Sequence, residues 1–426
     1  MADLVFFTDR YPYNNSETFI ENEIDILASY FDNVYCLPCG LMVDTMSKRT
    51  VPKNVHVLLP ACSDNIYLNK PSNLIKVIWA IKNLYLWFFL CFFSKHFYKE
   101  IHMLISEVGF TIPRFMRILR TLGPAIRNKH YYKNKLSKED IKEFYAYSYW
   151  IEPTVMFAED ILPKSLMKKA VCRTHRWDLY VEESSIKYLA FQKQVIDYVN
   201  QVYVISNDGV NYLKKLYPSF ANKIYLSRLG TIDYGLNPDM KDECFRIISC
   251  SNLIPVKRVE LIIDSLRILS ENYSNIEWIH FGTGQYLDQI KKYAAEKLQN
   301  MHYEFKGSVP NSQIMEYYRN THVDLFVNVS SSEGIPVSIM EACSFGIPVI
   351  ATNVGGTSEI VYHKKNGYLL EKDFHTETLA KYITDLILSE SLIKKMRIES
   401  REIWTTLFLC DRNYHNFYNC LIESYR

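Results

Sequence analysis

The sequence predicts an α/β protein with two doubly wound domains, and three observations support this prediction. Short apolar runs recur along the chain, and most end at a polar or glycine-containing loop that opens an amphipathic helical segment. This alternation is typical of a parallel sheet covered by helices. With 426 residues, the chain is too long for one ordinary core. A polar stretch containing Gly and Pro, residues 231–243, is the expected linker between the domains.

The first half begins with a βαβ pattern and returns to it after an interruption. The expected elements are, in chain order, a strand at 4–7, a polar turn at 9–16, a helix from about Glu17, and strands at 33–37, 170–173, 201–205 and 224–226. Ser16 is the expected N-cap of the first helix, because its hydroxyl can accept from a free backbone N–H of the first turn.

Residues 75–93 interrupt this pattern with an apolar, strongly aromatic segment that ends in Trp-Phe-Phe-Leu-Cys-Phe-Phe. Its uninterrupted apolar part, 84–93, is too short to span a bilayer. Two hypotheses remain open. The segment is either a buried helical insertion in the first domain, or an interfacial segment whose aromatic rings lie at a membrane surface while nearby lysines meet anionic lipid.

The second half alternates more regularly. Strands are expected at 245–250, 276–281, 303–306, 324–329 and 348–351, and helices at about 259–269, from 286, and at 311–318. Each strand ends at a loop that leads to a helix, as in doubly wound folds, whose ligands bind beyond the carboxyl ends of the strands.

The stretch Glu333–Glu341 is the most informative part of the chain. It follows an apolar strand and a serine-rich break, and it opens a short helix with Pro336 suited to the first helical position. Free N–H groups and the helix dipole favour an anion there. Glu333 lies in the loop before this site, and Glu341 lies five residues into the helix, about 7 Å along its axis. Two acceptors that flank the site in this way suit a ligand with hydroxyls on both sides of a phosphate group. A nucleotide sugar is such a ligand.

Several motifs, in order, resemble the C-terminal domain of retaining family 4 glycosyltransferases of the bacterial surface-polysaccharide type. They are SNLIPVKRVELIIDSL, FGTG, FKGSVPN and SSSEGIPVSIMEACSFGIPVIATNVGGTSEIV, and RTHRWDLY in the first half resembles that family's acceptor-side histidine motif. The resemblance implies the GT-B fold, in which two Rossmann-like domains face across a cleft. The expected domains are residues 1–235 on the acceptor side, with a helical insertion at about 70–140, and residues 236–400 on the nucleotide-sugar side. A C-terminal helix at 401–426 is expected to pack back towards the first domain.

The resemblance also implies site residues. Glu333, His175 and Lys257 are the expected catalytic residues: Glu333 at the transferred sugar, His175 near the reacting centre and Lys257 at the diphosphate leaving group. The expected donor-binding residues are Ser251, Asn252, Lys257, Arg258, Gly282, Glu333, Gly334, Ile335, Pro336, Val337 and Glu341, the last of which would hold the ribose. The family usually carries an arginine where this chain has Asn252, and Arg258 is a candidate replacement.

The chemistry of these residue types agrees with glycosyl transfer. Cleavage of a glycosyl–phosphate bond places negative charge on the diphosphate, which Lys257 and a helix N-terminus can stabilise. No Asp-x-Asp metal motif occurs, so no metal or other cofactor is expected. The resemblance implies retention by a same-face mechanism, in which the leaving phosphate accepts the proton of the acceptor.

Composition indicates the compartment and the partners. The formal net charge of +2 gives no reason to expect nucleic acid. Ten cysteines, mostly scattered singly, and an N-terminus without a basic leader favour a cytoplasmic protein, with peripheral contact at the inner face of the membrane as an option.

The sequence therefore predicts a retaining, metal-independent hexosyltransferase. It would use a UDP- or GDP-linked sugar and a glycan or polyprenyl-linked acceptor in bacterial cell-surface polysaccharide biosynthesis, such as O-antigen, lipopolysaccharide or capsule. Two alternatives remain: a nucleotide-sugar epimerase or hydrolase on the same fold, and a non-catalytic GT-B subunit that binds a partner glycosyltransferase.

Overall fold

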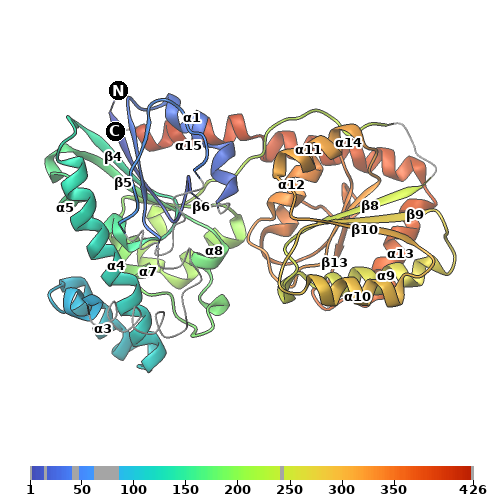
Figure 1. Ribbon diagram of the computed structural model, residues 1–426, viewed down its shortest axis with the longest axis horizontal. Coiled ribbons are helices and arrows are strands. Elements are labelled where there is room, and N and C mark those ends of the chain that lie inside the picture. Colours follow the sequence, from blue (N-terminus) through green and yellow to red (C-terminus); the bar gives the residue numbers. More distant parts are fainter. Residues whose placement is uncertain (1, 14–16, 41–47, 62–85, 240–243, 424–426) are drawn as a thin grey trace. The chain divides into compact units, whose positions relative to one another are not determined.

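The computed structural model describes residues 2–13, 17–40, 48–61, 86–239 and 244–423. The chain forms two compact units (Figure 1). Unit 1 comprises Met1–Ile205, Gly209–Ser227 and Tyr414–Arg426, and unit 2 comprises Ser206–Asp208 and Arg228–Asn413. Each unit contains one parallel sheet flanked by helices, so the predicted α/β fold class is confirmed.

The sheet of unit 1 has seven strands in the order β3-β2-β1-β4-β5-β6-β7, all parallel to their neighbours. They are β1 Asp3–Thr8, β2 Val34–Pro38, β3 Val55–Val57, β4 Phe144–Ser148, β5 Met167–Thr174, β6 Gln201–Val204 and β7 Ile224–Leu226. The chain runs outward from β1 in one direction and outward from β4 in the other. The point where the strand order reverses therefore lies between β1 and β4, and ligands of such sheets bind beyond the carboxyl ends of the strands at that point.

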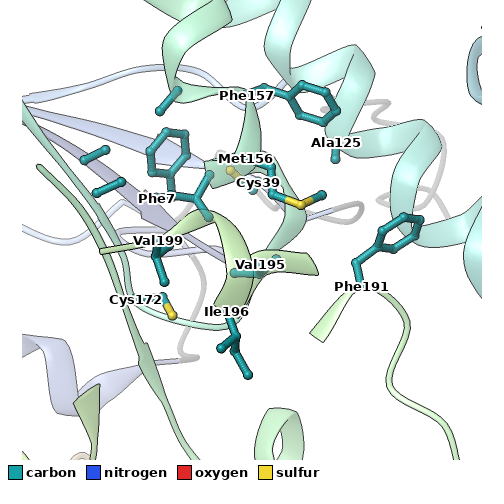
Figure 2. Packing of buried hydrophobic residues seen from close by; sticks show 14 of the residues in the cluster. Phe7, Cys39, Ala125, Met156, Phe157, Cys172, Phe191, Val195, Ile196 and Val199 are labelled. Carbon is teal, nitrogen blue, oxygen red and sulfur yellow. The ribbon is translucent and has the colours of Figure 1, made fainter. Parts of the chain in front are cut away.

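The helices of unit 1 are α1 Ile24–Ser29, α3 Lys95–Met103, α4 Ile112–Leu136, α5 Ala158–Ile161, α6 Arg176–Leu179, α7 Gln192–Tyr198 and α8 Asn207–Leu216. Figure 2 shows the core that they close over the sheet, where Phe7 of β1 packs near Met156, Phe157 and Val195. These side chains are almost fully buried, so the core holds the carboxyl ends of the strands in fixed positions.

The predicted helix from Glu17 is wrong in its first turn. Residues Thr18–Asn22 form a 3₁₀ helix, and α1 begins only at Ile24. Glu17 itself has a left-handed backbone (φ +55°), and its carboxylate accepts from the backbone N–H groups of Asp9, Arg10 and Tyr11 and from the indole of Trp150. These tertiary contacts outweigh local helix propensity. The expected cap Ser16 lies outside the described residues.

The aromatic segment is only partly described, since residues 75–85 fall outside the described ranges. Residues 86–92 are helical, with Trp87 and Cys91 buried. Five side chains on the described part of this segment are exposed: Leu86, Phe88, Phe89, Phe92 and Phe93, at 40%, 44%, 55%, 50% and 73%. Every helix within the described ranges is too short or too polar to cross a lipid bilayer.

The sheet of unit 2 has six parallel strands in the order β10-β9-β8-β11-β12-β13. They are β8 Phe245–Cys250, β9 Ile276–Phe281, β10 His302–Gly307, β11 Leu325–Asn328, β12 Val349–Thr352 and β13 Gly367–Leu370. The helices are α9 Val259–Ser270, α10 Leu287–Lys297, α11 Asn311–Asn320, α12 Val337–Ser344, α13 Thr376–Ile387 and α14 Glu390–Leu407. The strand order reverses between β8 and β11, which makes the loops after these two strands the expected ligand site of unit 2.

The last helix, α15 Cys410–Ile422, continues from unit 2 into unit 1. Its residues from Tyr414 onward pack within unit 1, where the hydroxyl of Tyr418 donates to the buried carboxylate of Glu23. Glu23 also pairs with the buried guanidinium of Arg173, with 2.7 Å between oxygen and nitrogen. Because both charges are removed from water, loss of either partner would leave a costly unpaired ion.

Candidate functional site

The loops after β8 and β11 carry most of the residues predicted from the sequence, and the fold brings them together at the reversal point of the sheet. Lys257 ends a short 3₁₀ turn in the loop after β8, and Glu333 lies in the loop after β11. The ammonium nitrogen of Lys257 lies 2.6 Å from Oε1 of Glu333, and the amide of Asn328 donates to the same oxygen at 3.2 Å. Lys257 and Glu333 therefore form one polar centre.

The N-terminus of α12 lies directly beyond Glu333. Pro336 is the N-cap and not the first helical residue, so the predicted position is wrong by one; its carbonyl accepts from the N–H groups of Ile339 and Met340. Among the described residues, nothing accepts from the backbone N–H groups of Gly334, Ile335 or Val337. These donors, with the positive end of the helix dipole and Lys257, make a site for an anion.

Glu341 lies on α12, beyond the helix start that follows Glu333, and is 8% exposed. The amide of Asn311, the first residue of α11, donates to its Oε1 at 2.8 Å. Burial raises the pKa of Glu341 to about 7. The second oxygen, Oε2, has no partner among the described residues, so it is available to accept from a ligand hydroxyl.

Asn311 is a site residue that the sequence reasoning missed. It ends the motif Phe-Lys-Gly-Ser-Val-Pro-Asn and begins a helix, but nothing in the local pattern says that its side chain turns towards α12. The one available signal is the position of the motif at the end of a parallel strand, where side chains converge on the ligand edge.

Arg258 lies next to Lys257, but its side chain is engaged elsewhere. Its backbone is left-handed (φ +48°), and its guanidinium donates to the carbonyls of Val329 at 2.8 Å and Ser330 at 3.4 Å. The N–H of Ser331 also donates to the carbonyl of Val256, at 2.8 Å. Arg258 thus ties the loop after β8 to the end of β11 and holds Lys257 opposite Glu333.

Two glycines fix the loops at close range. A Cβ on Gly282 (φ +143°) would lie 1.8 Å from the carbonyl oxygen of Ser251, and a Cβ on Gly355 (φ +51°) would lie 1.8 Å from that of Glu333. Gly282 was predicted as a donor-site residue. Gly355 begins a short 3₁₀ helix, Gly355–Glu359. Because neither glycine carries a Cβ, the backbone can approach these carbonyls closely. These contacts fix the positions of the loops after β8 and β11.

Ser251 and Asn252 follow β8 directly. The N–H of Ser251 donates to the carbonyl of Phe281, and its own carbonyl lies 3.1 Å from Nε2 of the buried His280. Burial lowers the pKa of His280 to about 4, so this histidine is a neutral support for the loop. Asn252 is exposed on the same loop.

His175 lies in unit 1, at the end of β5, where its backbone N–H donates to the carboxylate of Asp178 at 2.7 Å. Its ring stacks on Tyr149 and Phe19 and lies 4.3 Å from the ring of Trp150. The side chain is 6% exposed, and neither ring nitrogen has a partner among the described residues. Burial and the nearby Arg173 hold the pKa of His175 well below its usual value, so the ring is neutral.

A pocket of about 570 Å³ adjoins the loop after β8 without including Lys257, Glu333 or Glu341 in its lining. It is mainly apolar and is bounded by Leu253, Ile254, Tyr286 and Tyr293. The polar centre at α12 is the better anion site, because the free backbone N–H groups and the ammonium of Lys257 belong to it and not to the apolar pocket.

Two Rossmann-like units, one with an anion site at its strand reversal, define a protein of the GT-B class. Residues 238–403 match the family model for glycosyl transferases group 1. Residues 238–403 therefore form a domain of the group 1 (GT4) glycosyltransferase type, as the resemblance predicted for this part of the chain.

Curated relatives match part of the chain. It is similar to the amylovoran biosynthesis glycosyltransferase AmsK of Erwinia amylovora, with 26% identity over 48% of this chain and 50% of AmsK. It is also similar to a putative teichuronic acid biosynthesis glycosyltransferase, TuaC of Bacillus subtilis, with 38% identity over 23% of this chain and 21% of TuaC. The chain thus spans half or less of the length of these relatives.

Solved structures share the fold along the whole chain. The lipopolysaccharide outer core galactosyltransferase WaaB aligns over 99% of both chains with a TM-score of 0.65 and 14% identity. Anabaena Alr3699/HepE in complex with UDP aligns over 99% of both chains with a TM-score of 0.66 and 16% identity. At these identities the likeness establishes the GT-B fold and nothing more specific.

Proposed function

We propose that this protein is a retaining glycosyltransferase that transfers a hexose from a UDP- or GDP-linked sugar to a glycan or lipid-linked acceptor. The observation that carries the proposal is the polar centre of unit 2. Lys257 and three free backbone N–H groups face the place where a diphosphate would lie, and Glu333 and Glu341 stand on its two sides. The match of residues 238–403 to the group 1 family supports this reaction class.

The proposed roles follow from the charge that develops during transfer. As the bond between the sugar and the phosphate oxygen breaks, the diphosphate takes the electron pair, and Lys257 with the α12 amides stabilises it. Glu333 faces the sugar, which gains positive charge. Glu341 holds the ribose through Oε2. The leaving phosphate accepts the proton of the acceptor hydroxyl, and the new bond forms on the same face. His175 would contribute a neutral ring nitrogen on the acceptor side.

A role in bacterial surface polysaccharide assembly is supported by what the relatives are named for: amylovoran, teichuronic acid and the lipopolysaccharide outer core. We propose the same general setting for this chain. The sugar, the base and the linkage depend on side chains around the donor, and the names of distant relatives do not specify them.

Peripheral binding to an anionic membrane is part of the proposal. Phe88, Phe89, Phe92 and Phe93, which we name the phenylalanine patch, are exposed together on one short segment. The exposed Lys95 lies two positions after Phe93. Exposed aromatic rings beside basic side chains suit a bilayer interface, where rings insert and cations meet anionic headgroups.

A thermal-shift panel of nucleotide sugars, followed by a transfer assay, tests the proposal. A ligand present at a hundred times its dissociation constant should stabilise the protein by about 2.7 kcal/mol. One UDP or GDP sugar should raise the melting temperature, and release of its nucleotide should accelerate when bacterial membranes supply the acceptor. Absence of any shift across the panel would contradict the proposal, and an epimer or free sugar formed without acceptor would favour the alternative enzymes.

A further inference from the structure

Unit 1 contains a polar pocket of its own, at the point where its strand order reverses. It has a volume of about 120 Å³ and is lined by the loops that follow β1, β4 and β5. The loop after β1 supplies Asp9, the loop after β4 supplies Trp150 and Glu152, and α6 supplies Trp177. At about 30 Å³ per water molecule the pocket holds roughly four waters, so it has room for one edge of a sugar ring whose remainder stays outside.

Two carboxylates give the pocket its acceptor groups. Oε1 of Glu152 accepts from the hydroxyl of Thr154 at 2.6 Å, while no described residue bonds Oε2. Nε of Arg10 lies 3.2 Å from Oδ2 of Asp9, and the side chain of Asp9 is 40% exposed. Burial, with repulsion from Asp9, raises the pKa of Glu152 to about 7, and burial with repulsion from Glu17 raises the pKa of Asp9 to about 6. Oε2 of Glu152 and the carboxylate of Asp9 can therefore still form hydrogen bonds with a ligand.

Two indoles form the flat wall of the pocket. The rings of Trp150 and Trp177 lie 4.7 Å apart, and Trp150 in turn contacts His175. Trp150 is buried, whereas Trp177 is 58% exposed, which is unusual for so large an apolar side chain. An exposed indole beside open carboxylates offers an apolar face for the C–H groups of a sugar ring and acceptors for its hydroxyls.

We propose that this pocket binds an uncharged sugar residue, so that the acceptor is a glycan presenting a sugar hydroxyl and not a polyprenyl phosphate. The inference rests on the proposed function, whose acceptor class it narrows. The pocket juxtaposes Trp177 with Glu152 and Asp9, and this pairing of a flat apolar face with hydrogen-bond acceptors is the chemistry that recognises a sugar ring.

Other ligands fit these residues poorly. A phosphate would meet two carboxylates at close range, and like charges in a partly buried site repel strongly. The basic lining residue Arg117 is exposed and forms no ion pair with either acid among the described residues. A metal ion is not favoured, since the described residues contain no group of three His, Cys, Asp or Glu side chains arranged to hold one. A polyprenyl chain is too long for the pocket.

Saturation-transfer NMR on the full chain tests the inference with defined probes. The probes are glucose, galactose, N-acetylglucosamine, rhamnose and their common disaccharides, set against inorganic phosphate and geranyl phosphate. At least one saccharide should give a saturable signal. Trp177→Leu and Glu152→Gln should each weaken it about tenfold, the expected effect of losing a stacking face or a charge-assisted hydrogen bond.

The controls separate the outcomes. Glu143→Gln changes a surface carboxylate that directly precedes β4 and pairs with Lys168, and it should leave the signal unchanged. The same samples receive the nucleotide-sugar panel. If donors bind but no saccharide signal depends on Trp177, or if geranyl phosphate gives the Trp177-dependent signal, the inference is overturned while the proposed function stands. If donors also fail to bind, the proposed function fails as well.

Discussion

Lys257 and Glu333 are 76 positions apart in the chain, yet their charged groups lie 2.6 Å from each other. Their side chains are 22% and 10% exposed, so the pair lies largely out of water, and each charge depends on its partner for compensation. The ion pair matters because it holds Lys257 and Glu333 in position. A diphosphate that enters the site can take over the ammonium group, and Glu333 is then free to face the sugar.

Lys257→Ala should lower the turnover number by a factor of about 10²–10³, the usual effect of removing one donor from a developing anion. The melting temperature should fall only modestly, because the amide of Asn328 still donates to the Glu333 carboxylate that loses its cation. Steady-state kinetics and a thermal melt measure both quantities. Lys292→Ala, an exposed lysine on α10, is the matched control and should behave as the parent protein does. Unchanged turnover in Lys257→Ala would remove this residue from the reaction.

Glu341→Gln should stabilise the protein at high pH. The folded pKa of Glu341, about 7, lies above its ordinary value of 4.5, so the folded state holds the proton more tightly and the free energy of unfolding falls as the pH rises between these values. Gln removes this penalty, which amounts to about 3 kcal/mol. Denaturant melts should show equal stability at pH 4 and a more stable variant at pH 8, with weaker nucleotide binding. A variant less stable at pH 8 would refute the buried-charge interpretation.

At the scale of secondary-structure elements, two loops determine where the site residues lie. One leads from β11 to α12, and the other leads from β12 to Gly355. The N–H of Gly356 donates to the carbonyl of Gly334 at 2.6 Å, so the turn after β12 supports the loop that carries Glu333. An element outside the proposed donor site can thus control where the carboxylate of Glu333 lies.

Gly355→Ala should abolish donor binding, because its Cβ would lie 1.8 Å from the carbonyl of Glu333 and the loop would have to move. Gly307→Ala provides the control. Gly307 also has a positive φ, +71°, but a Cβ added there would meet no atom within 4 Å. Both variants should lose about 1 kcal/mol from backbone strain, and only Gly355→Ala should lose the thermal shift with nucleotide sugar. Equal donor binding in the two variants would show that the close contact does not matter.

Sequence patterns predicted most strands of both sheets, because buried parallel strands are short apolar runs that end at turn residues. They missed β3 and β13, whose three and four residues give no clear periodicity, and they named no strand at β4. They also misplaced the first helix. The contacts of Glu17 with Trp150, 133 positions away, decide that turn, and no local pattern contains them.

For the site, the motif around Glu333 and the strand–loop position of Lys257 were sufficient to bring both residues to one sheet edge. Asn311 and Gly355 could not be found in the same way, since their roles depend on which side chain or carbonyl they face in space. The polar pocket of unit 1 was likewise invisible, because its lining comes from several segments that are far apart in the sequence.

At the scale of the whole molecule, the fold persists where sequence identity is low. HepE and WaaB align along the full chain at 16% and 14% identity. Packing in parallel sheets requires apolar residues of suitable volume, which many sequences satisfy, whereas the donor site requires particular groups. The phenylalanine patch is also considered for the molecule as a whole, since the proposed membrane contact concerns the entire protein.

Phe89→Asp with Phe93→Asp should weaken binding to vesicles that contain phosphatidylglycerol by about a hundredfold or more, since each ring contributes roughly 1.5–3 kcal/mol when it leaves water. The fold should be unaffected because both rings are exposed, at 55% and 73%. Leu388→Asp, an exposed residue of unit 2 at 71%, is the control. Co-sedimentation measures the binding, and vesicle affinity equal to the parent's in the double variant would contradict the proposed membrane contact.

The central claim concerns where the donor lies, and a crystal structure with the nucleotide that gives the largest thermal shift tests it most directly. We expect a phosphate within hydrogen-bond distance of the N–H groups of Gly334, Ile335 and Val337, with the ammonium of Lys257 turned from Glu333 to the phosphate. A nucleotide seated instead in the pocket beside Tyr286 and Tyr293, with the Lys257–Glu333 pair intact, would contradict it.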